Sequence, residues 1–289
     1  MIVLTVLGGV LAGCGHPETL RTGAAAGPAI SGEPSPGPAA PSRAPASGPP
    51  VLAPGPGGLT PVFAGRAESS ASRKATGGDA KVVALTFDAD MTADQGQRAA
   101  GGEHFDNPGL IASLRRLKVP STVFMTGRWA QEYPSQARSI GTDPLFEIAN
   151  HSFSHYAFSS PCYGLPTVAE EDMRADVERA FTAIRETGAR QVVPYFRFPG
   201  GCYDDTALKA LAPTGVTAVQ WDVVSGDAFA TDADAVAEQV LEGVKPGSLV
   251  VMHCTRSAAP VTDEALRRIV PELRGRGYRF VKVSELMRG

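Results

Sequence analysis

The chain has 289 residues, of which 43% are hydrophobic, and its formal net charge is −3. This length and apolar content allow one sizeable core or two small ones. The nearly balanced charge lacks the basic excess that is typical of nucleic-acid-binding proteins, so we expect no nucleic-acid partner.

An apolar run of about 12 residues begins the sequence and is too short to span a bilayer. It ends in small residues, as the apolar region and cleavage site of a signal peptide do. Leu11-Ala12-Gly13-Cys14 resembles a bacterial lipobox, which implies a signal peptide over residues 1–13, cleavage before Cys14 and lipid attachment to Cys14. We therefore expect an extracytoplasmic lipoprotein that is anchored at the outer face of the cell membrane.

The next segment has the composition of a linker. Residues 15–78 contain 12 of the 24 prolines in the chain and one aromatic residue, Phe63. Such a sequence cannot bury a core and is typical of disordered or polyproline-like linkers. The sequence therefore predicts a tether over residues 14–78 and a folded domain over residues 79–289.

The folded part alternates between buried strands and amphipathic helices. We expect strands at 81–90, 121–127, 145–150, 192–199, 216–224 and 248–254. We expect helices at 107–117, 128–140 with a break near Pro134, 167–188, 204–213, 232–244 and 262–277, and residues 278–287 close the chain. About seven strands, each followed by a helix, predict an α/β domain with a parallel sheet, either open and doubly wound or closed into a barrel.

Polar residues recur at the ends of these strands. In α/β proteins the chemistry gathers at the carboxyl ends of parallel strands, so residues from separate strands meet there. The residues at those positions are Asp88, Asp90, His151, His155, Arg197, Asp227 and His253.

Two histidines and a carboxylate form a familiar site for a divalent metal. His151 and His155 are four residues apart, so a helical turn would direct both imidazoles to one side. A metal with open positions polarises a carbonyl and lowers the pKa of water, and a second carboxylate can accept the proton of that water. These residues indicate metal-assisted hydrolysis of an amide or an ester.

Five segments carry a family resemblance. They are Thr86-Phe87-Asp88-Ala89-Asp90, His151-Ser152-Phe153-Ser154-His155, Arg197-Phe198-Pro199-Gly200-Gly201, Trp221 through Asp227, and Val251-Met252-His253. In this order they resemble the motifs of polysaccharide deacetylases with a NodB homology domain, carbohydrate esterase family 4. The resemblance covers about residues 80–286 and implies a distorted (β/α) barrel of about seven strands. We expect the protein to work as a monomer.

The resemblance implies roles for the first two motifs. Asp88 matches the catalytic base, and both histidines match metal ligands, with Zn²⁺ as the expected ion. The family's third ligand is an aspartate at the position of Ala89, so Asp90 must replace it. Because a one-residue step in an extended chain points to the other face, we expect a turned backbone at Asp90. The alternative is that Asp90 is a loop acid and the metal site is defective.

The other motifs imply a catalytic apparatus around that metal. Arg197 would orient Asp88, and His253 would be the general acid, tuned by Asp227. Gly200 stands where the family has tyrosine, but its N–H can still donate to an oxyanion. The family's tryptophan after Asp227 is alanine here, and the remaining groove residues are Trp221 and Val251. Asp222 is an alternative partner for His253.

Three cysteines lie in the folded part, near the motifs. Outside the cytoplasm, Cys162 and Cys202 would be able to form a disulfide that braces two loops at the rim of the site. The alternative is three free buried thiols, including Cys254.

The function that the resemblance implies is removal of acetyl groups from a cell-wall or extracellular polysaccharide, with an N-acetylglucosamine polymer as the expected substrate. One alternative is a carbohydrate-binding protein of the same fold with impaired catalysis. Another is a hydrolase of the same fold that acts on a small amide or ester.

Overall fold

The computed structural model describes residues 60–65 and 81–288. The expected signal peptide, Cys14 and most of the expected tether lie outside these residues. Everything below therefore concerns the folded domain and the short segment that precedes it.

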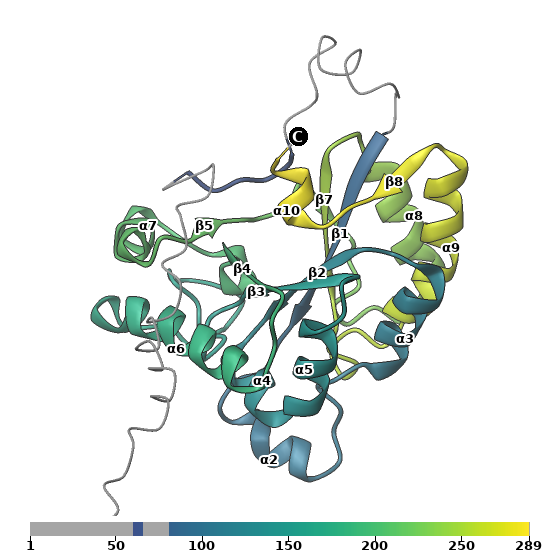
Figure 1. Cartoon of the computed structure of the whole chain (residues 1–289). Coiled ribbons are helices and arrows are strands. Elements are labelled where there is room, and N and C mark those ends of the chain that lie inside the picture. Colours follow the sequence, from purple (N-terminus) through teal and green to yellow (C-terminus); the bar gives the residue numbers. More distant parts are fainter. Residues whose placement is uncertain (1–59, 66–80, 289) are drawn as a thin grey trace, which may run out of the picture. The chain divides into compact units, whose positions relative to one another are not determined.

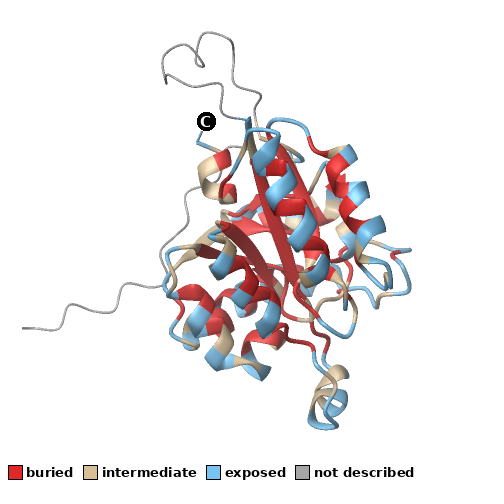
Figure 2. Ribbon diagram, turned by 90° about the vertical axis from the view of Figure 1, so that its right-hand side faces the viewer, coloured by how far each residue is buried: buried red, intermediate tan, exposed pale blue. Residues whose placement is uncertain are grey.

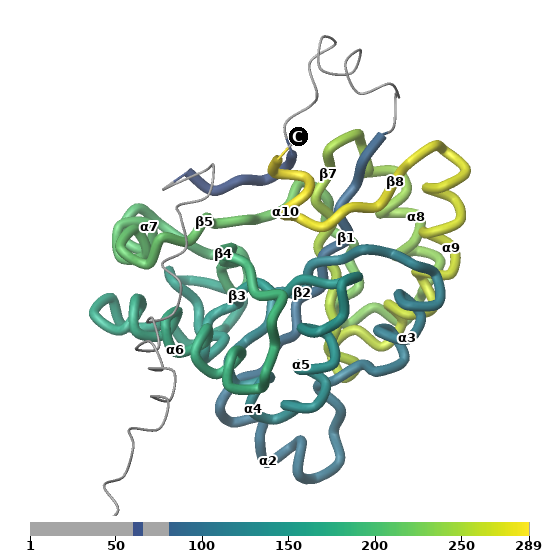
Figure 3. The backbone as a smooth tube through the Cα atoms, in the orientation of Figure 1, coloured from purple at the N-terminus to yellow at the C-terminus, as the bar shows by residue number. Residues whose placement is uncertain are grey.

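A curled parallel sheet forms the centre of the domain (Figure 1). Its strands are β1 (Lys81–Ala89), β2 (Ser121–Met125), β3 (Phe146–Asn150), β4 (Val192–Phe196), β5 (Thr217–Ala218), β6 (Val223–Val224), β7 (Ser248–His253) and β8 (Tyr278–Phe280). The order across the sheet is β5-β4-β3-β2-β1-β7-β6, and β8 pairs with the start of β1. Figure 3 follows the chain from β1 through β4, where strands that are neighbours in sequence are also neighbours in the sheet. The distorted (β/α) barrel expected from the sequence is confirmed.

Helices lie around the outside of the sheet, and most of them pack a buried face against it, whereas the short helix Gln95–Ala100 has no buried residue (Figure 2). They are α2 (Gln95–Ala100), α3 (Pro108–Leu117), α4 (Gly127–Glu132), α5 (Pro134–Gly141), α6 (Met173–Glu186), α7 (Asp205–Leu211), α8 (Ala233–Gly243), α9 (Thr262–Gly275) and α10 (Val283–Leu286). The start of α3 follows from its sequence, because Asn107 caps the Leu110 N–H and Pro108 pre-sets the first turn. Among the described residues, no helix is both long enough and apolar enough to cross a membrane.

The prediction of one continuous strand at residues 216–224 is wrong. The chain instead forms β5 at one edge of the sheet, crosses the barrel, and forms β6 at the other edge. The reason is a competition for backbone carbonyls. Arg197 donates from Nε to the Val219 carbonyl at 3.2 Å and from Nη2 to the Gln220 carbonyl at 3.2 Å. In a continuous strand these two carbonyls would accept hydrogen bonds from a neighbouring strand. Here they accept them from the Arg197 side chain, and the chain crosses the barrel.

A short part of the expected tether belongs to the fold. Residues 60–65, dark blue beside β5 in Figure 1, lie between β5 and the start of β7. The Val62 N–H donates to the Ala218 carbonyl at 2.9 Å, and the Val62 carbonyl accepts from the Gln220 N–H at 2.8 Å. Further on, the Gly65 N–H donates to the Gly247 carbonyl at 2.8 Å. The expectation of a linker up to residue 78 is therefore wrong over this segment.

This segment should contribute to stability. We expect Val62→Pro to lower the melting temperature by about 2–8 °C, because proline cannot donate to the Ala218 carbonyl. Phe63→Pro is the matched control, since among the described residues no acceptor is bonded to the Phe63 N–H. Calorimetry of the full chain measures both variants. Equal melting temperatures for the two prolines would show that the segment adds nothing to the fold.

Candidate metal and catalytic site

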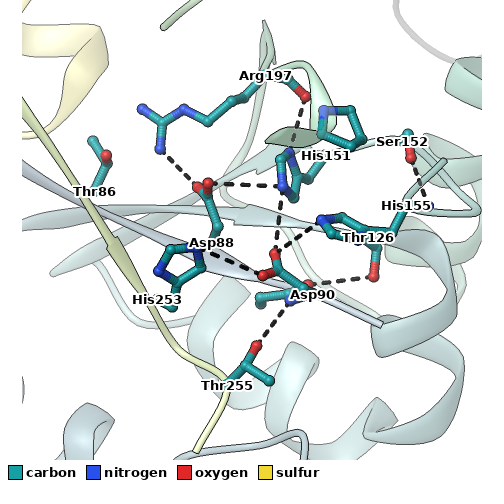
Figure 4. A network of polar contacts seen from close by, with 12 residues as sticks. Thr86, Asp88, Asp90, Thr126, His151, Ser152, His155, Arg197, His253 and Thr255 are labelled. Carbon is teal, nitrogen blue, oxygen red and sulfur yellow. Dashed lines mark hydrogen bonds and ion pairs between the residues drawn. The ribbon is translucent and has the colours of Figure 1, made fainter. Parts of the chain in front are cut away.

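The residues expected at the strand ends do converge on one site. Asp88 lies at the end of β1, His151 directly follows β3, Arg197 directly follows β4, and His253 ends β7. Figure 4 shows their side chains pointing toward one another, with Asp90 among them. The carboxyl edge of the sheet therefore carries the acids, the imidazoles and the guanidinium that the sequence singled out.

Asp90 lies one residue beyond the end of β1. Ala89 is fully buried in the main hydrophobic core, together with Leu85 and Phe87 of the same strand. Asp88 alternates with these residues and points away from that core, and the Asp90 carboxylate faces the same imidazoles (Figure 4). The expectation of a turned backbone at Asp90 stays a prediction. The Asp90 N–H also donates to Thr255 Oγ1 at 3.1 Å, which holds the chain just beyond β1.

Asp90, His151 and His155 form a donor set that fits a divalent cation. Asp90 Oδ1 is 3.3 Å from His151 Nε2 and 3.7 Å from His155 Nε2. Two ligands of a tetrahedral zinc ion are about 3.3 Å apart when each bond is about 2.0–2.1 Å long. In the described part of the chain, Asp90 Oδ1 is a buried atom without a hydrogen-bond donor. A buried carboxylate oxygen that faces two imidazole nitrogens is what a cation site requires.

The protonation states of His155 and Asp90 also fit a metal. Burial lowers the pKa of His155 to about 4, so its imidazole is neutral at pH 7. Burial by itself raises the pKa of Asp90, but His155, His151 and His253 outweigh burial and hold this pKa below its ordinary value. Metal ligands must be neutral imidazoles and ionised carboxylates, so both groups are ready to bind.

His151 is oriented by a hydrogen bond from its second ring nitrogen. His151 Nδ1 lies 2.9 Å from the Arg197 carbonyl, to which it donates, and this leaves Nε2 free for a cation. Burial by itself lowers the pKa of His151, but Asp88 and Asp90 raise it overall. The carboxylates that favour a proton on Nε2 favour a cation at the same place.

The loop that carries the histidines is held by an acid that the sequence analysis missed. Ser152 and His155 have positive φ values of 68° and 57°, a conformation that costs about 1–3 kcal/mol per residue. Asp176 of α6 accepts the Phe153 N–H at 2.8 Å and so fixes the loop in this shape. An acid in the first turn of a helix is already explained by the helix dipole. The sequence therefore provides no reason to expect that Asp176 contacts this loop.

Asp88 is paired with a fully buried arginine. Arg197 Nη1 is 2.7 Å from Asp88 Oδ1, and the guanidinium lies over the Phe124 ring at 3.8 Å from its centroid. The other carboxylate oxygen, Asp88 Oδ2, is 3.7 Å from His151 Nε2. Asp88 is therefore fixed on one side by Arg197 and faces the metal donors on the other.

His253 is paired with Asp227, as the motifs indicate. His253 Nδ1 is 2.8 Å from Asp227 Oδ1, and Asp227 Oδ2 accepts the His253 N–H at 2.7 Å and the Thr262 hydroxyl at 2.7 Å. Burial by itself lowers the pKa of His253, but the bond to Asp227 and the charges of Asp227, Asp90 and Asp88 outweigh burial and raise this pKa to about 10. His253 Nε2 lies 3.9 Å from Asp90 Oδ2, so the protonated ring faces the metal donors.

Asp222, the alternative partner, is used elsewhere. Its Oδ2 accepts the Ser248 hydroxyl at 2.8 Å and its Oδ1 accepts the Leu249 N–H at 2.7 Å. Asp222 therefore ties the crossing between β5 and β6 to the start of β7.

Thr262 supports the pair of Asp227 and His253 through its bond to Asp227, and the sequence did not indicate this role. A threonine at the start of α9 carries no signal of its own.

The turn after Arg197 leaves no space for a side chain at residue 200. Gly200 has φ +62° and lies in a short 3₁₀ turn (Pro199–Gly201), where an added Cβ would be 2.7 Å from Cys162 Sγ. Cys162 and Cys202 form the expected disulfide, with an S–S distance of 2.10 Å. Cys254 is a buried free thiol. The oxyanion role of the Gly200 N–H stays a prediction.

The two expected groove residues differ in exposure. Trp221 is half-buried and lies beside Arg197, whose guanidinium carbon is 5.4 Å from the centre of the indole ring. Val251 is buried within β7. A role for either in lining a substrate groove stays a prediction.

The residues of the site differ in their exposure to solvent. The side chains of Arg197 and Asp227 are almost fully buried, whereas 23% of the His253 side chain is exposed. His155 and Asp90 are exposed to an intermediate degree. The Asp88 carboxylate beside the buried Arg197 guanidinium, the three possible metal ligands and the His253 imidazole thus lie together, and part of this group is exposed to solvent. That arrangement suits hydrolysis of an amide or ester carbonyl.

Comparisons with known proteins point to one family. Residues 75–219 match the family model described as polysaccharide deacetylase. The chain is 30% identical over 181 residues to a chitooligosaccharide deacetylase of Sinorhizobium fredii, covering 59% of this chain and 80% of that protein. It is 28% identical over 211 residues to a peptidoglycan-N-acetylglucosamine deacetylase of Bacillus cereus, covering 72% of this chain and 89% of that protein.

A solved structure shares the fold. The chain resembles a carbohydrate esterase family 4 pseudoenzyme from Bacillus anthracis with a TM-score of 0.58 and 24% identity. The match covers 72% of this chain and 66% of that chain. At this identity the likeness concerns the arrangement of helices and strands alone.

Proposed function

Because this chain belongs to the polysaccharide deacetylase family, we propose that it is a metal-dependent hydrolase that removes acetyl groups from N-acetylglucosamine residues of a cell-wall or extracellular polysaccharide. The relatives named above act on chitooligosaccharides and peptidoglycan, which supports this substrate class. The observation that carries the proposal is the position of Asp90 beside His151 and His155. It gives the chain a complete donor set although residue 89 is alanine.

The proposed roles follow from the contacts of each residue. When bound, a divalent cation, Zn²⁺ in our proposal, polarises the acetyl carbonyl and lowers the pKa of nearby water. Asp88, which Arg197 fixes at 2.7 Å, takes the proton of the attacking water. The Gly200 N–H donates to the oxygen on which negative charge develops. His253, protonated and held by Asp227, gives a proton to the departing amine.

The geometry favours an active enzyme over an impaired carbohydrate-binding protein. Ala89 would impair the enzyme only if the third ligand were missing, because two histidines alone would then hold the metal. Asp90 Oδ1 lies 3.3 Å and 3.7 Å from the two imidazole nitrogens, so the third donor is supplied from the next residue. The base and the acid also keep their buried partners, Arg197 and Asp227.

Acetate release tests this function. The full chain, purified in detergent, is incubated with hexa-N-acetylglucosamine and with peptidoglycan, as purified, after chelation and after Zn²⁺ is restored. We expect chelation to abolish acetate release and zinc to restore it. Acetate release that is insensitive to chelation would contradict the metal mechanism. Binding of zinc without acetate release from either polymer would favour the impaired carbohydrate-binding protein.

The pair of Asp227 and His253 predicts a pH effect. As the general acid, His253 must carry a proton, and Asp227, together with Asp90 and Asp88, raises its pKa to about 10, so activity should persist into alkaline solution. Asp227→Asn removes this charge, and the alkaline limb of the kcat profile should move to lower pH while kcat falls by about 10²–10⁴-fold. Thr262→Val is the control, because it removes one bond to Asp227 but keeps the carboxylate. An unmoved limb in Asp227→Asn would exclude His253 as the acid.

The lipid anchor is a proposal that rests on the sequence of residues 11–14 alone. Cys14→Ser should move the protein from the membrane fraction to the soluble fraction, since a lipobox needs the cysteine thiol. Cys254→Ser removes a different thiol and should leave the distribution unchanged. Fractionation of the producing cells measures both variants. Cys14→Ser protein that stays with the membranes would exclude lipid attachment at Cys14.

A further inference from the structure

Two exposed aromatic residues have an unfavourable backbone conformation. The Tyr163 residue is 91% exposed and Phe229 is 83% exposed. Their φ values are +47° and +59°, in the left-handed region where a side chain is strained and glycine is preferred. An exposed ring contributes little to packing, so neither ring compensates for its strained backbone within the folded chain. Strain of this kind is a sign of function.

Tyr163 lies at the tip of a rigid turn beside the site. The Leu165 N–H donates to the Cys162 carbonyl at 2.8 Å, and Gly164 after Tyr163 also has a positive φ, of 78°. Consecutive left-handed residues closed by such a bond form a tight turn. The disulfide joins the base of this turn to Cys202. Tyr163 Cδ2 is 3.3 Å from the place where a Cβ of Gly200 would be, so the ring lies beside the turn that follows Arg197.

Phe229 lies on the other side of the catalytic strand. It follows Asp227 by two residues, and its N–H donates to the Ala258 carbonyl in the loop after β7 at 2.6 Å. Tyr163 belongs to the loops of β3 and β4, whereas Phe229 belongs to those of β6 and β7. In the sheet order, β1 with Asp88 lies between these two pairs of strands. The two residues therefore lie on loops at the carboxyl edge of the sheet, on either side of β1 in the strand order.

We propose that Tyr163 and Phe229 are stacking surfaces for the pyranose rings on either side of the sugar that loses its acetyl group. This inference rests on the proposed function, because only a polymeric substrate places a sugar on each side of the reacting one. The flat C–H face of a pyranose packs on an aromatic ring, and a ring with few free torsions binds with little loss of conformational entropy. The strained turn and its disulfide hold Tyr163 in position before the substrate arrives.

Glycine substitutions separate this role from a structural one. Tyr163→Gly and Phe229→Gly remove a ring and relieve a positive φ, so each should leave the melting temperature unchanged or higher. Each should also weaken binding of hexa-N-acetylglucosamine by about tenfold and leave hydrolysis of 4-nitrophenyl acetate within about twofold of wild type. Tyr163→Phe and Phe229→Tyr keep the rings and should bind the hexamer as the wild type does.

Calorimetric titration of the full chain, after chelation, measures binding of the hexamer independently of catalysis, with acetylated xylohexaose as the second probe. Loss of binding with retained stability supports the proposal, whether or not acetate is released, so a failure of the proposed function is seen separately. Unchanged binding in the glycine variants would overturn the proposal, as would a lowered melting temperature or a wild-type chain that binds neither oligosaccharide. A change in self-association, with unchanged sugar binding, would assign the rings to contacts between copies of the chain.

Discussion

Asp90→Ala is expected to lower the affinity for Zn²⁺ by more than about 10²-fold and to abolish acetate release. Loss of a residue that merely supports a metal ligand costs about 10–100-fold in affinity, and loss of a direct ligand should cost more. Asp90 Oδ1 is the donor that faces both imidazoles, at 3.3 Å and 3.7 Å, and without it only His151 and His155 remain. Zinc titration against a competing chelator measures the affinity.

Asp94→Ala is the matched control for this variant. Asp94 lies four residues later, before α2, and its Oδ1 accepts the Thr92 hydroxyl. The control removes one carboxylate from the same connection and should bind zinc as the wild type does. Undiminished zinc binding by Asp90→Ala would show that the ion is held elsewhere and that Asp90 is a loop acid.

Asp88→Asn is expected to lower kcat by about 10²–10⁴-fold while the protein keeps its zinc. The amide has nearly the shape of the carboxylate but cannot take a proton from water. Asp88 also neutralises Arg197, which is fully buried and 2.7 Å away, so the variant should unfold at a lower temperature. The metal content of the folded protein and its rate of acetate release are the two measurements.

Arg197→Lys complements this variant. Lysine loses the bonds from Arg197 to the Val219 and Gln220 carbonyls, so kcat should fall. Because Asp88 and a positive charge near it are both retained, kcat should fall less than in Asp88→Asn. Zinc lost from a folded Asp88→Asn protein would make Asp88 a metal ligand. Full activity in that variant would exclude Asp88 as the base.

Much of the fold follows from local pattern in the sequence. Most residues of the strand at Lys81–Ala89 are apolar, and α3 begins where Asn107 and Pro108 predict. The site is predictable because parallel strands bring their carboxyl ends to one edge, so a histidine at the end of β7 meets an acid at the end of β1. Residues 165 positions apart in the chain, Asp88 and His253, are direct neighbours in the register of these strands.

What the sequence could not show depends on contacts between distant residues. The apolar run at 216–224 has the pattern of one strand, and only the bonds from Arg197 reveal a crossing. Residues 60–65 have the composition of a linker, although Val62 pairs with the sheet. Alternation along β1 could not place Asp90, because this residue lies beyond the end of the strand, where its carboxylate faces two imidazoles from a distant loop. Asp176 and Thr262 act through bonds to partners 23 and 35 residues away.

Asp90 should complete the metal site in spite of Ala89, and a crystal structure of the chain with Zn²⁺ would show whether it does. We expect one ion bound to His151 Nε2, His155 Nε2 and a carboxylate oxygen of Asp90, with metal–ligand distances of about 2.0–2.2 Å. An ion held by the histidines together with Asp88, or no ion at this position, would show that Asp90 is not the third ligand.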